Sequence, residues 1–256
     1  VLFRSVDGLQ ALMEKYNTKY FTFSDEAVSP HALNDMSELM IERGVETRSL
    51  AWLKFEKVMD EKLFAKMKKA GFVFLMFEFG LESANDRVLA LIDKGTTKAV
   101  ERDVLMKSHK AGIWNHSFLF FGFPTETRPE AEETIDFLRD NLESIHSFGP
   151  GVFLLNRDSS CYQYPEKFSI ERIIEDPDRN IAMNLDFVAK EGMSREEAGE
   201  MNDECIKMAE ELFPSLKVWG TLPREHFLLY LDKFGKEALN GKQPPAEEEG
   251  KVLCRA

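Results

Sequence analysis

The sequence contains no apolar run near the ~20 residues that a membrane-spanning helix needs, and no signal peptide opens it. Basic residues are scarce relative to acids, with 33 Lys and Arg against 45 Asp and Glu and a formal net charge of -12. Because proteins hold nucleic-acid phosphates with clustered Lys and Arg, this balance argues against a nucleic-acid surface, although a local basic patch is not excluded. We therefore expect a cytoplasmic protein without a membrane partner.

Cysteine is also rare. Cys161, Cys205 and Cys254 are odd in number and lie tens of residues apart. This spacing argues against a disulfide framework and matches no metal-binding motif. His109, His116 and His146 do not form a metal-binding spacing either. We expect ordinary thiols and no metal site within this chain.

Two apolar runs, residues 72–79 and 118–123, are what the sequence does have. Strands buried on both faces read as continuous apolar runs, so both segments are expected to be buried parallel strands. Each run leads into a turn that pairs glycine with a carboxylate, GLES at 80–83 and GFPTE at 122–126. Because the carboxyl ends of parallel strands face the ligand crevice, the two turns should stand side by side at one rim.

A repeated unit of helix, glycine and strand occurs at Gly44, Gly71 and Gly112. Glycine at a helix end followed directly by a strand predicts a parallel α/β sheet with right-handed crossovers. The strands are expected at residues 19–23, 46–53, 72–79, 118–123 and 151–156. The helices are expected at 8–16, where Asp7 would cap the first turn, and at 30–43, 60–69, 85–92, 98–110, 129–144, 195–212 and 224–234.

The segments GLESANDRVLALIDKG, residues 80–95, and LFFGFPTETRPEAEETIDFL, residues 119–138, together resemble the fourth and fifth βα units of radical S-adenosylmethionine (SAM) enzymes. The branch that often carries an N-terminal cobalamin-binding domain is the most similar. The resemblance extends from about Arg4 to Asn156. It implies a partial (β/α) TIM-like barrel with parallel strands, in which about five of the family's six βα units are present and the first is missing.

The resemblance also implies cofactors that this chain alone does not explain. The family holds a [4Fe-4S] cluster with a Cys-x3-Cys-x2-Cys loop, and one-electron reduction of bound SAM gives a 5'-deoxyadenosyl radical. No such loop is present here. The implied parent enzyme would use SAM, the cluster and, in this branch, often cobalamin. A reductant such as flavodoxin or ferredoxin would supply the electrons. The reaction would be hydrogen abstraction or radical alkyl transfer, and the substrate, a small molecule or another kind, is not identified.

The first five residues, VLFRS, are what a common sequencing-adapter end encodes in frame. We therefore expect residues 1–5 to be non-native, the cluster ligands to lie upstream in the parent, and the fragment alone to be inactive. The alternative is that Arg4 and Ser5 are native, because the family often has this pair before its first helix. With residues 1–5 non-native, we expect residues 6–156 to form the partial barrel, 157–240 an acidic helical extension, and 241–256, rich in Pro and Glu, a disordered tail.

The resemblance assigns polar residues at two strand ends to SAM. Asp25 and Glu26 would accept hydrogen bonds from its amino group, since a carboxylate suits an ammonium. The alternative for both is a turn residue before a helix. Glu82 and Ser83 would lie near the ribose hydroxyls, and Ser83 has the alternative role of capping the next helix. Lys54 replaces an arginine of the family, which weakens the case for a carboxylate contact there.

The second turn is assigned to the adenine. Gly122 permits close backbone approach, and Phe123 and Pro124 supply apolar surface for a planar base. Asn156 and Arg157, at the end of the last predicted strand, are weaker candidates for substrate contact.

Two other functions remain open from the sequence. A different TIM-barrel enzyme could use Glu82 and Glu126 as an acid-base pair. A barrel remnant without its cluster could instead act as a non-catalytic binding or scaffold protein.

Overall fold

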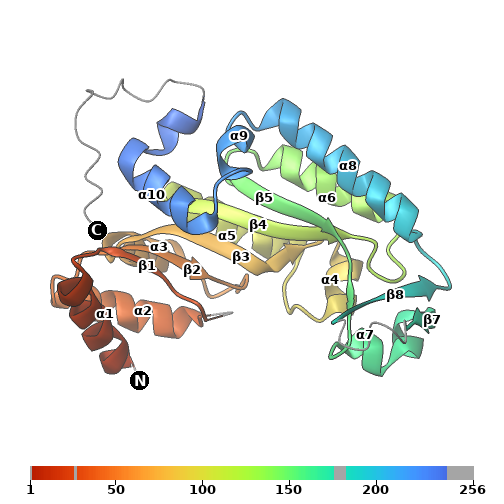
Figure 1. Ribbon diagram of the computed structural model, residues 1–256, viewed down its shortest axis with the longest axis horizontal. Helices are drawn as coiled ribbons and strands as arrows, with labels where there is room; N and C mark the ends of the chain where they lie inside the picture. The colour runs from red at the N-terminus through yellow and green to blue at the C-terminus, as the bar shows by residue number, and fades with distance from the viewer. Residues whose placement is uncertain (1, 26–27, 176–182, 241–256) are drawn as a thin grey trace.

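The computed structural model describes residues 2–25, 28–175 and 183–240 (Figure 1). Its main sheet has five parallel strands in the order β1-β2-β3-β4-β5. They are β1 (Tyr20–Thr22), β2 (Arg48–Trp52), β3 (Phe72–Glu82), β4 (Trp114–Phe121) and β5 (Ser147–Val152). The strand order follows the chain order, as repeated right-handed crossovers require. The predicted parallel α/β fold is confirmed.

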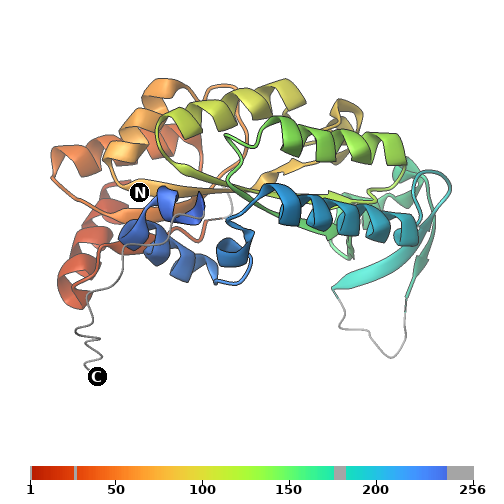
Figure 2. The same cartoon turned by 90° about the horizontal axis from the view of Figure 1, so that it is seen from above.

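Helices α3 (Glu61–Lys69), α5 (Lys98–Lys110) and α6 (Arg128–Asp140) cover one face of this sheet (Figure 2). The other crossover helices are α2 (Pro30–Glu42) and the short α4 (Asp86–Ile92), and α1 (Leu2–Tyr16) precedes β1. A continuous core forms between this layer and the sheet, with Phe64, Phe72 and Phe121 among its buried side chains. Within the described ranges, no helix is long and apolar enough to cross a membrane.

The first helix is longer than the sequence suggests. It begins at Leu2, so Asp7 lies inside it and is not its cap. The Asp7 carboxylate instead accepts a 2.5 Å hydrogen bond from Arg43 at the end of α2. The predicted cap was wrong because an aspartate followed by an apolar pattern also fits an exposed position in a helix interior.

The glycines that end the predicted helices behave as expected. Gly44, Gly71 and Gly112 all have positive φ, the left-handed backbone that lets a helix stop within one residue. At Gly71 a side chain is also excluded by space, because a Cβ there would lie 2.1 Å from the carbonyl oxygen of Thr47. The strand after each glycine therefore starts at a fixed place against its neighbour.

The region after residue 156 is not wholly helical. Strands β6 (Leu155–Asn156), β7 (Ile170–Ile174) and β8 (Asn184–Ala189) form a second, antiparallel sheet in the order β6-β8-β7. The last predicted strand, at 151–156, is thus divided between β5 and β6. Strands β7 and β8 are short and carry acidic side chains at exposed positions, so their alternation of apolar and polar residues is weak. For this reason the sequence suggested a helical region here.

The remaining elements are α7 (Ser160–Gln163), η1 (Pro165–Phe168), α8 (Arg195–Leu212), α9 (Leu216–Trp219), α10 (Arg224–Phe234) and η3 (Lys236–Asn240). Helices α8 and α10 have the predicted bounds. Helix α8 runs beside α6, whereas α10 lies on the opposite face of the sheet (Figures 1 and 2). There, Phe227 packs edge-on against Phe74 of β3 and Trp114 of β4. Helix α10 of the C-terminal extension thus covers part of the face that α3, α5 and α6 leave open.

Candidate functional site

The two strand ends that the sequence singles out do lie side by side. Strands β3 and β4 are neighbours in the sheet, and Glu82 is the register partner of Leu119, three residues before Gly122. Both turns therefore open at the carboxyl end of the sheet, where parallel folds bind their ligands.

Glu82 is a buried carboxylate at the end of β3. Only 8% of the residue is exposed, and its backbone has φ of 36°, a strained value for a residue other than glycine. Burial raises the pKa of Glu82, and the opposite charges of Lys94 and Lys54 partly offset that rise. Lys94, in the loop after α4, forms an ion pair with the Glu82 carboxylate. Glu82 is thus a buried carboxylate at the rim that is paired with the Lys94 ammonium.

Ser83 does not cap the next helix, which was its alternative role from the sequence, because the N-cap of α4 is Asn85. Its hydroxyl oxygen accepts a 3.2 Å hydrogen bond from the backbone N–H of Asn85 and lies 3.4 Å from the hydroxyl of Thr134 in α6. Thr134 in turn accepts a 2.9 Å bond from the backbone N–H of Ala84. The fully buried Ser83 therefore fixes the entry to α4, and its hydroxyl points into the protein.

The second turn is held by its own carboxylate. Glu126 is fully buried, and its Oε2 accepts a 2.7 Å hydrogen bond from the backbone N–H of Gly122. Its Oε1 has no partner in the described structure. Burial raises the pKa of Glu126 to about 7, although hydrogen bonds from Gly122 and Phe123 act in the opposite direction. The main charges that act on Glu126 are those of Glu130 and Arg87, so the geometry gives no support to an acid-base pair with Glu82.

Phe123 and Pro124 are both buried. The Phe123 ring packs edge-on against Phe153 at 5.0 Å and against Phe168 at 5.9 Å. The small antiparallel sheet supplies much of this cover. In this conformation the Phe123 ring faces the protein, and Gly122 is the part of the turn that lines a cavity.

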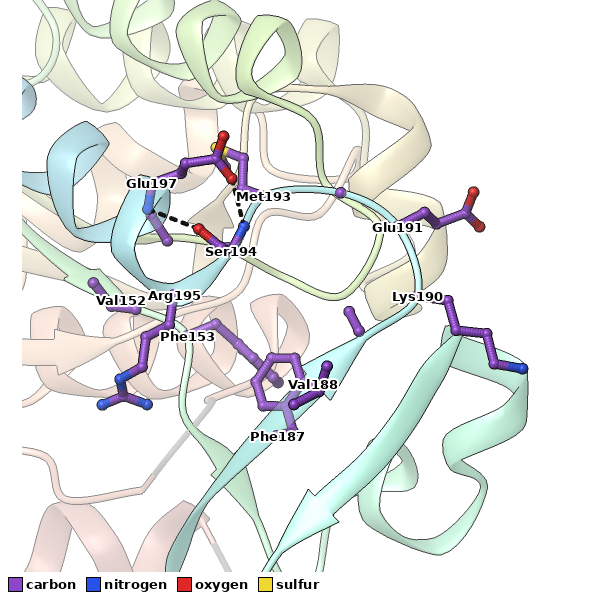
Figure 3. A pocket seen from close by; sticks show the side chains of 14 residues that line it. Val152, Phe153, Phe187, Val188, Lys190, Glu191, Met193, Ser194, Arg195 and Glu197 are labelled. Carbon is purple, nitrogen blue, oxygen red and sulfur yellow. Dashed lines mark hydrogen bonds between the residues drawn. The ribbon is translucent and has the colours of Figure 1, made fainter.

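This cavity, of about 300 Å³, lies between the ends of β4 and β5 and the segment that connects β8 to α8. Its apolar wall includes Val152, Phe153 and Phe187. The Phe153 and Phe187 rings lie against each other, with 5.8 Å between centroids, whereas Lys190 and Glu191 point away from them (Figure 3). The backbone of residues 189–194 and the first turn of α8 complete it, with Ser194 and Glu197 engaged in a capping box. Such a cavity, with an apolar wall and polar groups around it, suits a flat ligand group that also carries polar atoms.

The other predicted site residues lie apart from this cavity. Asp25 is exposed after β1, and Glu26 falls outside the described residues. Asn156 belongs to β6, where its side chain accepts a 2.9 Å hydrogen bond from the backbone N–H of Asp158. Arg157 pairs with Glu175 at 3.5 Å in the same small sheet. The structure thus places Glu82 and Gly122 at the ends of neighbouring strands, with only Gly122 of the two lining the cavity, and the two weaker candidates lie at and just after β6.

Two features of this region were missed by the sequence analysis. Lys94 pairs with Glu82 from twelve residues further on, and only the helical turn of α4 brings the two together. Gly192 and Met193 close over the GFPTE turn, where the Met193 N–H donates a 2.7 Å bond to the Glu126 carbonyl. A Cβ on Gly192 would lie 2.7 Å from the backbone of Thr125, so glycine is required for that approach. The glycine at 192 was the one visible signal.

The described residues hold no group of three His, Cys, Asp or Glu side chains that fits a metal ion. Cys161 and Cys205 are buried, and burial raises their thiol pKa values to about 11 and about 12. Iron-sulfur clusters need thiolates. Cys254 lies outside the described residues. The cysteines that the structure describes therefore do not fit a cluster.

The sequence model described as Radical SAM superfamily matches residues 4–138. An uncharacterized methyltransferase of Pyrococcus horikoshii is 31% identical over 140 residues, which are 53% of this chain and 29% of that protein. The anaerobic magnesium-protoporphyrin IX monomethyl ester cyclase of Rubrivivax gelatinosus is 27% identical over 143 residues, 53% of this chain and 24% of that protein. The chain thus spans between 24% and 29% of the length of these relatives.

Two solved structures share the fold over most of the chain. The cobalamin-dependent S-adenosylmethionine radical enzyme OxsB has a TM-score of 0.63 at 13% identity, covering 90% of this chain and 40% of that chain. The radical S-adenosylmethionine methyltransferase TsrM from Kitasatospora setae has a TM-score of 0.61 at 13% identity, covering 94% of this chain and 56% of that chain. At these identities the likeness shows the fold alone.

Proposed function

Because the chain belongs to the radical SAM superfamily, we propose that it is part of an enzyme that binds S-adenosylmethionine at the carboxyl ends of β3 and β4. The observation that carries the proposal is the placement of a buried carboxylate, Glu82, and a glycine turn, Gly122, at the ends of neighbouring strands, with a partly open cavity beside Gly122. A nucleoside needs both an acceptor for its ribose hydroxyls and a flat apolar surface for its base.

The residues around the cavity fit the adenosine part of the ligand. The backbone of Gly122 lines the cavity, and Val152 and Phe153 offer apolar contact to a planar base. Glu82 can accept hydrogen bonds from a diol once it exchanges its contact with Lys94. We leave Ser83 out of this site, because its hydroxyl is engaged at the start of α4. Asp25 remains our candidate for the ligand's amino group, at the end of β1.

The [4Fe-4S] cluster that the family implies does not fit the described residues, as shown above, so no step through it is assigned to them. We propose that the parent enzyme carries the cluster elsewhere, takes electrons from a flavodoxin or ferredoxin, and acts in the cytoplasm. OxsB and TsrM, the fold neighbours, are described as cobalamin-dependent or cobalamin-bound. This supports cobalamin as a further cofactor and radical modification of a substrate, such as methyl transfer, as the reaction class.

The test uses binding, which needs no turnover. Titration calorimetry on the whole chain measures its affinity for 5'-deoxyadenosine, for adenine and for S-adenosylhomocysteine. We expect Glu82→Gln to weaken the binding of 5'-deoxyadenosine at least tenfold and to leave the binding of adenine unchanged, because adenine lacks the diol. Asp25→Asn should weaken the binding of S-adenosylhomocysteine alone, since only that ligand carries the amino group.

Glu56→Gln is the matched control, because Glu56 is an exposed acid after β2. Equal affinity of Glu82→Gln and the wild type for 5'-deoxyadenosine would remove Glu82 from the site. Failure of all three ligands to bind the folded chain would favour the scaffold alternative.

A further inference from the structure

A second cavity, of about 350 Å³, lies at the opposite end of the sheet from Glu82 and Gly122. We call it the amino-end pocket and define it by Arg48, Lys68, Asp232 and Lys236, which line it together with Val73, Gly112, Leu231 and Gly235. Arg48 begins β2, Lys68 is in the last turn of α3, and Lys236 begins η3. Helix α10 lies over the strands there (Figure 1). The pocket exists only because the C-terminal helices return to the sheet.

The two lysines of the pocket have backbone carbonyls as partners. The Lys68 ammonium donates a 2.7 Å hydrogen bond to the Gly112 carbonyl, and Lys236 donates a 2.7 Å bond to the Ile113 carbonyl. Across the described ranges, neither ammonium has a carboxylate within ion-pair distance. Partly buried ammonium groups without a counter-ion are costly, because burial removes water and nothing replaces its charge stabilisation.

The one carboxylate of the pocket is already neutralised. Asp232 accepts a 2.7 Å bond from Arg48 and a 2.7 Å bond from the Tyr20 hydroxyl, and it pairs with Lys19 at 2.9 Å. These three groups tie α10 to β1 and β2. They leave no free charge on Asp232 for Lys68 or Lys236, so the pocket carries an excess of positive charge.

The basic groups also act on one another. Burial and then the charge of Lys68 lower the pKa of Lys236 to about 7. Burial and the charge of Arg48 lower the pKa of Lys68. The charge of Lys236 also acts on His109 and His146, which share a neighbouring cavity of about 320 Å³ with it. A bound anion would relieve all of these repulsions at once.

We propose that the amino-end pocket binds a small oxyanion of phosphate size, free or as the terminal phosphate of a small molecule. Each ammonium keeps two N–H donors after its one carbonyl bond, and Arg48 keeps its second Nη. Three cationic groups that converge from β2, α3 and η3 form the donor set that phosphate prefers. This site is separate from the proposed SAM site and would stabilise the packing of the C-terminal helices on the sheet.

The experiment measures inorganic phosphate and ribose 5-phosphate by titration calorimetry on the whole chain, with thermal unfolding as a second readout. We expect binding at one site and a rise in Tm with phosphate concentration. Lys68→Met and Lys236→Met should each weaken binding at least tenfold, since each removes one charge and keeps the length of the side chain. Tighter binding of ribose 5-phosphate would indicate a phosphate ester, and preference for phosphate a free anion; both support the proposal.

The control is Lys69→Met, the exposed neighbour of Lys68 on α3, which does not line the pocket. It changes the net charge equally and should leave binding unchanged. Absence of binding of both probes to the wild type overturns the proposal, and so does equal weakening by the control. Near-ultraviolet circular dichroism checks that each pocket variant is folded. If one of them is not, the phosphate affinity of the other variant tests the proposal.

Discussion

At the scale of single residues, burial raises the pKa of Glu126, the acid of the GFPTE turn, to about 7. Its carboxylate closes the turn through Gly122, yet Oε1 is buried without a partner. A neutral carboxylic acid loses less hydration free energy than a charged carboxylate when it is removed from water. The turn is therefore more stable when Glu126 is protonated.

This gives a prediction for pH dependence. The folded protein keeps a proton on Glu126 up to about pH 7, whereas the unfolded chain releases it near the ordinary value of 4.5. Stability contributed by this group must fall as pH rises between these values, by about 3 kcal/mol in total. In urea unfolding, Glu126→Gln should gain free energy of unfolding relative to the wild type as pH rises from 5 to 8. A difference between the two proteins that is independent of pH would contradict the assignment.

Gly122 supports a second prediction. Its φ is 81°, and a Cβ would lie 2.5 Å from the Cβ of Ala198 in α8. Gly122→Ala combines backbone strain with a steric clash, so it should lower the free energy of unfolding by about 2–4 kcal/mol.

Gly199→Ala is the matched control, because that glycine lies in α8 with open space around its Cβ position. It should raise stability by up to about 1 kcal/mol, the helix propensity gain. Equal effects of the two substitutions in denaturant unfolding would show that the close approach of the turn and α8 does not exist.

The sequence predicted part of the site at this scale. Glu82 and Gly122 were visible because a carboxylate and a glycine directly follow apolar strands. Lys94 was not visible as a partner, because its contact depends on the path of α4 and the loop after it. The burial of Phe123 was not visible either, since residues 153 and 168 reach it only through the fold.

At the scale of elements, α10 provides a test of the packing. Phe227 is buried between α10 and the sheet, 5.1 Å from Trp114 and 5.6 Å from Phe74 between ring centroids. Phe227→Ala should lower the free energy of unfolding by about 3–5 kcal/mol, since it removes a large buried side chain. Leu229→Ala, at an exposed position of the same helix, should cost less than about 1 kcal/mol. Similar small effects would mean that α10 does not pack on the sheet in solution.

Elements with local end signals were predicted closely. Thr97, Ser194 and the glycines after the helices mark boundaries through bonds within a few residues, and α5, α8 and α10 have the predicted bounds. The pair β7 and β8 was missed because its strands gain stability mainly from each other and from the aromatic cluster around Phe123. Such contacts between distant residues leave little trace in local periodicity.

At the scale of the whole molecule, the cysteines give a prediction about iron. Anaerobic reconstitution of the chain with iron and sulfide should yield no bound [4Fe-4S] cluster, because the two described thiols are buried and far from a cluster spacing. Iron and sulfide analysis after gel filtration, with the visible absorption spectrum, checks this. About four irons per chain, retained by the wild type and lost in Cys161→Ser or Cys205→Ser, would contradict it.

The class of fold and the family were accessible from the sequence, because the helix, glycine and strand repeat and the two linked motifs are local patterns. The position of the C-terminal extension was not. Its helices could be recognised, but the side of the sheet that each covers depends on contacts such as Tyr20 with Asp232, 212 residues apart.

The late position of α10 in the chain has a consequence for biosynthesis. The aromatic face formed by Phe74 and Trp114 stays exposed on the nascent chain until the ribosome has released residues 227–239. During this interval chaperones that bind exposed apolar surface should bind the half-covered sheet. The yield of folded protein in cells should therefore depend on such chaperones more than the final stability of the protein suggests.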